Sequence, residues 1–194
     1  MQNIGQTLKS NPLAGLALLA GIMLATRFHH FGAVTHLPDA SLAVFFLTGF
    51  YLRRAIYMVP LMLLAGGIDY LATQHMGVSD YCISPAYGFL IPTYAAMWFG
   101  GRWYAGRHSM EASSLAPLAF ALLIGGSLAF LISNGGFYLF SGRYPDMNWG
   151  EYMQRVSMYY LPYMSGMVFY VALAALAHIG VTRMGAAAGN TAHS

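Results

Sequence analysis

Charged side chains are scarce in this sequence. Only 8% of its 194 residues are Asp, Glu, Lys or Arg, whereas a soluble globular domain carries roughly 25%. So few charges, together with 58% hydrophobic residues, exclude an ordinary soluble domain and predict an integral membrane protein. Long polar segments are missing as well, which favours a single membrane domain over residues 1–194 and gives no reason to expect a nucleic-acid partner.

Cysteine is almost absent, and the one residue present, Cys82, excludes an internal disulfide. It lies in the segment 79–87, whose Asp, Tyr, Ser and Pro residues indicate an ordered loop. A free cysteine is often a small buried hydrophobe, and this interpretation stays open. The polar neighbours favour an accessible thiol, and a thiolate prefers a soft or borderline metal. A single protein ligand implies a metal already held by another molecule, such as a porphyrin or a corrin.

Apolar segments separated by short polar ones predict an all-α bundle of six transmembrane helices. The helices are expected at 12–27, 40–53, 55–72, 86–101, 116–133 and 156–181, and three longer loops at 28–39, 73–85 and 134–155. The second segment is short for a span of about 20 residues, which indicates a tilted helix or one that includes flanking residues. In the first segment Ala17, Gly21 and Ala25 form a smooth face, suited to packing within the bundle or to docking another membrane subunit.

The basic residues predict the orientation of the six helices. If the segments alternate, six basic residues lie on one side and three on the other, which places both termini in the cytoplasm. The majority side holds Lys9, Arg53, Arg54, Arg102, Arg107 and Arg183, and the minority side holds Arg27, Arg143 and Arg155. The three longer loops then share the outer face. Their aromatic residues, histidines and glycines are suited to a pocket for a large flat organic ligand.

Asp69 is a plausible intramembrane carboxylate near the end of the third segment. A carboxylate there must be paired, hydrogen-bonded or at the water boundary. It either caps nearby backbone amides at the interface or faces a ligand pocket. Ion channels fit poorly, because the spans lack rings of polar or charged residues.

Four stretches of the sequence resemble a known family of transporters. They are Arg27-Phe-His-His-Phe31, Gly66-Gly-Ile-Asp-Tyr70, Asp80-Tyr-Cys-Ile-Ser-Pro-Ala-Tyr-Gly88, and Arg155 before the last helix. Over nearly its whole length the chain resembles the S components of energy-coupling-factor (ECF) vitamin transporters, and more closely the BtuM group of proteobacterial vitamin B12 transporters. The resemblance implies a multi-pass protein of the bacterial cytoplasmic (inner) membrane. It also implies cobalamin as the transported ligand, and either an ECF energising module or no energising partner.

The same resemblance implies roles for five residues. Cys82 is expected to bind the cobalt of cobalamin as its lower axial ligand, which displaces the nucleotide base and leaves a base-off corrin, with His30 as a rival axial ligand. Asp69, Tyr87 and Arg155 are expected to form or support the pocket, with Arg155 pairing either with Asp69 or with the phosphate of the nucleotide loop. A thiolate at cobalt weakens the bond to an upper cyanide, so Cys82-dependent decyanation of cyanocobalamin is a further expectation.

Two other classes of protein remain as alternatives. A membrane redox protein would bind haem through pairs of histidines among His29, His30, His36 and His178. A small structural or assembly factor would use its Ala and Gly faces only to contact partner proteins.

Overall fold

The computed structural model describes residues 11–29, 37–75, 81, 83–146 and 148–191, and every regular element among them is a helix. The elements are α2 (Pro12–His29), α3 (Ser41–Leu47) with the π-turn η1 (Thr48–Leu52), the 3-10 turn η2 (Ala55–Tyr57) with α4 (Met58–His75), η4 (Pro85–Phe89) with α5 (Leu90–Ala105), η5 (Ala112–Ser114) with α6 (Leu115–Phe140), and α7 (Trp149–Thr191). The expected all-helical class is therefore confirmed.

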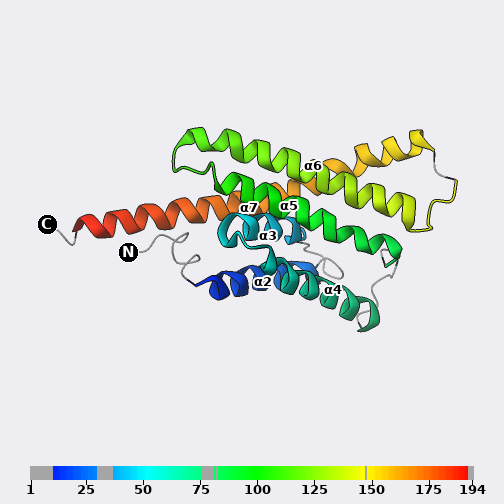
Figure 1. Cartoon of the computed structure of the whole chain (residues 1–194), viewed down its shortest axis with the longest axis horizontal. Coiled ribbons are helices and arrows are strands. Elements are labelled where there is room, and N and C mark those ends of the chain that lie inside the picture. The colour runs from blue at the N-terminus through cyan, green and yellow to red at the C-terminus, as the bar shows by residue number, and fades with distance from the viewer. Residues whose placement is uncertain (1–10, 30–36, 76–80, 82, 147, 192–194) are drawn as a thin grey trace.

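Three helical segments within the described residues are long and apolar enough to cross a membrane. They are Ala55–His75, Ala112–Phe140 and Trp149–Gly185. The segments Pro12–Arg27 and Ser41–Leu52 are apolar but shorter. α7 has 43 residues, which at ~1.5 Å per residue makes it much longer than the ~30 Å hydrocarbon core of a bilayer. The helix extends beyond the other helices at its C-terminal end (Figure 1).

The short helix α3 lies in the centre of the molecule. α2 and α4 lie together on one side of it, and α5, α6 and α7 lie on the other (Figure 1). Phe45 and Phe46 are among the largest fully buried side chains. The short second segment expected from the sequence is therefore a buried element of the core, and its tilt relative to a membrane stays a prediction.

Two glycines allow the backbones of η1 and α5 to touch. A Cβ atom at Gly49 would lie 2.0 Å from the carbonyl oxygen of Trp98, and one at Gly101 would lie 1.9 Å from that of Phe46. No real side chain tolerates such distances, so glycine is required at both positions. The close approach fixes α5 against the central helix.

The expected bounds of the helices are close to the observed ones except at the last loop. The sequence predicts a loop over 134–155, but α6 continues to Phe140 and α7 begins at Trp149. The glycines at 135 and 136 are helical, and the ring of Phe89 packs where a Cβ of Gly136 would lie, at 2.5 Å. The connection is therefore short, and most of the predicted loop is helix.

The C-terminal end of α4, the start of α5 and the turn from α6 to α7 lie at one end of the bundle, whereas α7 ends at the other (Figure 1). The hydroxyls of Tyr81 and Tyr144 meet at 2.9 Å, which joins the residue Tyr81 before η4 to the turn after α6. On α2, Ala17, Gly21 and Ala25 are exposed, and a Cβ at Gly21 would meet nothing within 4 Å. The smooth face of the first helix thus does not pack within the described part of the bundle.

Candidate functional site

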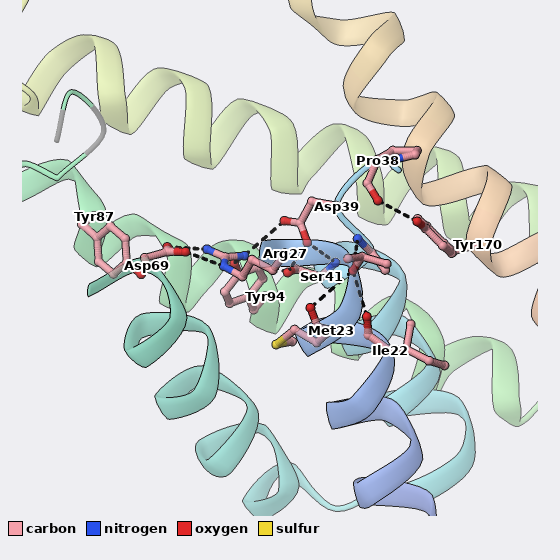
Figure 2. A network of polar contacts seen from close by, with 12 residues as sticks. Ile22, Met23, Arg27, Pro38, Asp39, Ser41, Asp69, Tyr87, Tyr94 and Tyr170 are labelled. Carbon is pink, nitrogen blue, oxygen red and sulfur yellow. Dashed lines mark hydrogen bonds and ion pairs between the residues drawn. The ribbon is translucent and has the colours of Figure 1, made fainter. Parts of the chain in front are cut away.

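Arg27, in the last turn of α2, is a buried cation at the centre of a polar network. Its Nε donates to Asp69 Oδ1 at 2.6 Å and its Nη2 donates to Asp69 Oδ2 at 2.5 Å. The two residues are 7% and 9% exposed. Such a two-bond fork between guanidinium and carboxylate offsets much of the cost of burying both charges. It also connects α2 to α4, because Asp69 lies on α4 (Figure 2).

The remaining nitrogen of Arg27 binds the start of the central helix. Nη1 donates to Ser41 Oγ at 2.7 Å and to Asp39 Oδ2 at 3.1 Å. Asp39 Oδ1 in turn accepts hydrogen bonds from the backbone N–H and the hydroxyl of Ser41. An aspartate that accepts from amides at a helix N-terminus stabilises that end of the helix. The beginning of α3 is therefore fixed to the end of α2.

Two tyrosines complete the network from the α5 segment. Tyr94 Oη accepts from Arg27 Nη1 at 3.1 Å, and its ring stacks on Phe45 with centroids 4.1 Å apart. Tyr87, in η4, donates its hydroxyl proton to Asp69 Oδ2 at 2.8 Å. Protein acceptors thus occupy every nitrogen of the Arg27 guanidinium. Arg27 therefore positions the surrounding side chains rather than offering a free guanidinium to an anionic ligand.

A cavity of about 570 Å³ adjoins this network. Arg27, Asp39, Ser41 and Tyr94 form its polar wall, and residues of α6 and α7 lie opposite, including Ser133, Tyr159, Pro162 and Tyr163. The volume is within the range of small-molecule sites, ~300–1,000 Å³. The cavity therefore combines mostly apolar walls with a few fixed polar groups.

Tyr163 supplies a further polar group in the α7 wall of the cavity. Its hydroxyl is buried and makes no hydrogen bond within 3.5 Å to a described residue, although the Ser133 hydroxyl lies near it. Pro38, which lines the cavity, accepts a hydrogen bond at its carbonyl from Tyr170 Oη at 2.7 Å, which connects α7 to the segment before α3 (Figure 2). A buried hydroxyl without a close partner is costly, so a ligand that reached Tyr163 would gain a hydrogen bond there.

The structure brings together two of the five site residues expected from the sequence. Asp69 and Tyr87 are hydrogen-bonded, and Asp69 is paired with Arg27 rather than capping backbone amides. Of the two partners expected for Arg155, Asp69 is paired with Arg27 instead, and the ligand phosphate stays a prediction. The Arg155 guanidinium instead lies over Tyr144 and Tyr138, 4.5 and 5.4 Å from the ring centroids.

The remaining expected site residues, His30 and Cys82, lie outside the described residues, as does His36 of the haem alternative. His178, on α7, is hydrogen-bonded through Nδ1 to the Tyr51 hydroxyl at 3.1 Å. The centroids of the His178 and His108 rings are 5.4 Å apart. In the described part of the chain, no three His, Cys, Asp or Glu side chains are grouped so that they could hold a metal ion. The described residues alone therefore do not supply a complete metal site.

Sequence reasoning did not assign Arg27, Asp39 and Tyr94 to the site. One signal was available for Arg27, because a charged residue at the end of an apolar helix needs a partner and Asp69 is also charged within an apolar segment. Asp39 two residues before Ser41 is a helix-start signal of the kind that places an aspartate beside backbone amides. Nothing in the local sequence around Tyr94 distinguishes it from the other tyrosines.

The fold and site define an α-helical protein whose buried Arg27 joins its own helix to three others beside a cavity, with three helices of a length and composition suited to a membrane. Compared with known protein families and with curated proteins, the chain matches no family and no curated relative.

Proposed function

We propose that this chain binds vitamin B12 and transports it across the cytoplasmic membrane of a bacterium. The observation that carries the proposal is the network of Arg27, Asp69 and Tyr87 beside a cavity of about 570 Å³. Asp69 and Tyr87, which the family resemblance assigns to the cobalamin pocket, are hydrogen-bonded to each other, and Asp69 binds Arg27, which lines the cavity. Fixed polar groups in a mostly apolar cavity favour a large organic ligand over an ion.

The placement of Tyr81 supports a role for Cys82 at the ligand. Tyr81 precedes Cys82 in the chain, and its hydroxyl meets that of Tyr144 in the connection from α6 to α7. The Arg143 guanidinium also lies over the Tyr81 ring, 4.9 Å from its centroid. Cys82 thus directly follows, in the sequence, a tyrosine that is held by contacts with Arg143 and Tyr144. In the proposal its thiolate binds cobalt as the lower axial ligand, with the vitamin in the base-off form.

Decyanation of cyanocobalamin is part of the proposal. On the lower face the sulfur–cobalt bond forms as the cobalt–nitrogen bond to the nucleotide base breaks. On the upper face the cobalt–cyanide bond breaks, and cyanide leaves with its electron pair and takes up the thiol proton as HCN. Cobalt remains Co(III), so the exchange needs no oxidant or reductant. A strongly donating thiolate opposite cyanide weakens the bond that must break.

The orientation, with both termini in the cytoplasm, and the choice of energising partner belong to the same proposal. The exposed face of Ala17, Gly21 and Ala25 supports docking of an ECF-type module, since small residues let another helix approach closely. Transport by the chain alone is the other form of the proposal. The two are distinguished by whether uptake in cells requires the genes of an ECF module.

The direct test is the visible spectrum of the purified protein with cyanocobalamin. We expect the cyano spectrum to be replaced by that of a sulfur-ligated corrin and one equivalent of cyanide to be released. Cys82→Ser, which is nearly the same size, should still bind the vitamin weakly without converting it. An unchanged spectrum with the native protein, or equal conversion by Cys82→Ala, would contradict the axial role of Cys82.

Uptake is tested separately in a bacterial strain that needs vitamin B12 and lacks its own importer. The native chain should restore growth on low concentrations of the vitamin, and Cys82→Ala should reduce that growth. Expression of both proteins in the membrane is checked by immunoblot. If the native chain fails to restore growth both with and without an ECF module, the proposed transport function is wrong.

A further inference from the structure

A second cavity, of about 390 Å³, lies between the end of α6 and the start of α7. Three aromatic side chains, Tyr138, Trp149 and Tyr152, form most of its wall, together with Gly135, Leu139 and Asn148. None of these residues lines the cavity beside Arg27. The volume is that of a site for a small organic group rather than for water alone.

The rings of this aromatic pocket are held at steep angles to one another. Tyr152 meets Tyr138 with centroids 5.3 Å apart and an interplanar angle of 69°, and it meets Trp149 at 5.9 Å and 77°. Tyr138 is buried, whereas Trp149 is 80% exposed. A large aromatic side chain exposed beside a hollow is a surface on which another planar ring can stack.

Two guanidinium groups make the surroundings of the pocket cationic. Arg155 lies over the Tyr138 ring, which itself lines the pocket, and over Tyr144; Arg143 lies over Tyr81. In the part of the chain that the structure describes, neither guanidinium is within ion-pair distance of a carboxylate. No carboxylate among the described residues therefore neutralises either charge. Arginine is also the side chain best suited to hold a phosphate, because its fork of N–H groups matches the phosphate oxygens.

A planar ring site beside two arginines that no described carboxylate neutralises matches an aromatic base linked to a phosphodiester. We infer that the aromatic pocket of Tyr138, Trp149 and Tyr152 binds the benzimidazole base of the vitamin once Cys82 has displaced it from cobalt, while Arg155 and Arg143 face the phosphate of the nucleotide loop. This inference rests on the proposed function. In the base-off form the displaced base stays covalently linked to the corrin, so it needs a binding site within reach of the corrin.

The contacts of Tyr144 connect the cysteine segment to this pocket. Its hydroxyl meets that of Tyr81, the neighbour of Cys82, and its ring stacks on Tyr138 with centroids 4.2 Å apart and planes 6° apart. Tyr81, Tyr144 and Tyr138 thus form one continuous row of aromatic residues that ends at the pocket. The tether between corrin and base needs only to follow this row.

The test compares binding of cobalamin with binding of cobinamide, which has the same corrin but no nucleotide loop. Affinities are measured by spectral titration for the native protein, Trp149→Ala and Trp149→Phe, with Phe99→Ala as a control at an exposed aromatic residue on α5. Stacking of one base on an aromatic side chain contributes roughly 1–3 kcal/mol, so we expect Trp149→Ala to weaken cobalamin binding by about fivefold or more. Cobinamide binding should be unchanged, and Trp149→Phe should recover most of the loss.

The possible results separate the inference from the proposed function. Suppose that the native protein binds cobalamin and cobinamide with equal affinity, and that Trp149→Ala either leaves both affinities unchanged or lowers both equally. The base then does not occupy the pocket, although the protein still binds the corrin. If neither ligand binds the native protein, the proposed function fails and the inference fails with it. Circular dichroism of each variant confirms that it is folded, which the 80% exposure of Trp149 leads us to expect.

Discussion

Arg27 and Asp69, 42 residues apart in the chain, form a two-bond fork inside the bundle, with distances of 2.6 and 2.5 Å. Because the same guanidinium also binds Ser41 and Tyr94, one side chain connects α2, α3, α4 and α5. A buried pair of this kind is costly to break on one side, since the other charge stays in the interior without its partner. The fork therefore serves as a structural support for the cavity beside it.

Asp69→Asn should destabilise the protein strongly. Removing one partner of a buried ion pair costs about 3–5 kcal/mol, because the guanidinium of Arg27 loses its main counter-charge. Asp39→Asn is the matched control. Asp39 makes one longer contact to Arg27, at 3.1 Å, and its side chain is 32% exposed, so we expect a loss of at most ~1 kcal/mol. Unfolding in detergent by chemical denaturant measures both.

A double-mutant cycle tests whether the ion pair of Arg27 and Asp69 is the cause of this loss of stability. Combined with Arg27→Gln, Asp69→Asn should cost much less than the sum of the two single changes, because each change alone already breaks the fork. Additive losses would show that the two residues do not stabilise each other. A loss for Asp39→Asn as large as for Asp69→Asn would contradict the central place of Asp69.

Gly101→Ala should prevent correct packing of α5, whereas Gly21→Ala should be harmless. A Cβ at Gly101 would lie 1.9 Å from the backbone oxygen of Phe46, and backbone atoms cannot move aside without shifting the helix. At Gly21 a Cβ meets nothing within 4 Å, so alanine should stabilise α2 by up to ~1 kcal/mol through its higher helix propensity. Thermal unfolding in detergent distinguishes the two. Equal stability would show that α3 and α5 do not touch there.

Asn148→Ala should weaken the start of α7. The Asn148 side-chain oxygen accepts from the backbone N–H of Glu151 at 3.0 Å, which is the bond of a helix N-cap. Loss of a cap costs roughly 0.5–2 kcal/mol, and Asn148→Asp should keep most of the stability because aspartate caps equally well. Amide exchange of residues 149–155 is the more local measurement. Unchanged exchange in Asn148→Ala would place the true start of α7 further along the chain.

This cap illustrates what the sequence could and could not predict. Asn148 followed by Glu151 is a helix-start pattern, yet the surrounding glycines and polar residues favoured a loop over 134–155. The glycines at 135 and 136 are helical instead, and the ring of Phe89, 47 residues earlier than Gly136, fills the space where a Cβ of Gly136 would lie. Composition and apolar run length were sufficient for the helices, since these depend on local chemistry.

The site depended on contacts between distant residues. Charge in an apolar segment indicated that Asp69 needed a partner, but local sequence could not choose between Arg27 and Arg155. The structure chooses Arg27 because α2 packs beside α4, whereas Arg155 at the start of α7 stacks on tyrosines of α6 and its following turn. Which distant residues form an ion pair depends on how the helices pack, and helix packing cannot be predicted from local sequence patterns alone.

Acidification should destabilise the end of the bundle that holds His108. This side chain lies in the connection from α5 to α6, with Nδ1 2.9 Å from the Tyr104 hydroxyl and its ring 5.1 Å from that of Phe50. Burial lowers the pKa of His108 below its ordinary value of about 6.5, because the charged imidazolium loses water there. The unfolded chain therefore takes up this proton at a higher pH than the folded chain.

The sign of the effect follows from proton uptake. Between the lowered pKa of folded His108 and about pH 6.5, the unfolded state binds more protons, so the free energy of unfolding falls as the pH falls through this window. Above it, His108 is neutral in both states and contributes no pH dependence. His108→Gln keeps a polar side chain beside Tyr104 but cannot titrate, so its stability should fall less between pH 7 and pH 5 than that of the native protein. The imidazole resonances in an NMR titration give the midpoint directly. A midpoint of 6.5 or above, or the same pH dependence in His108→Gln, would show that burial of this ring does not oppose its protonation.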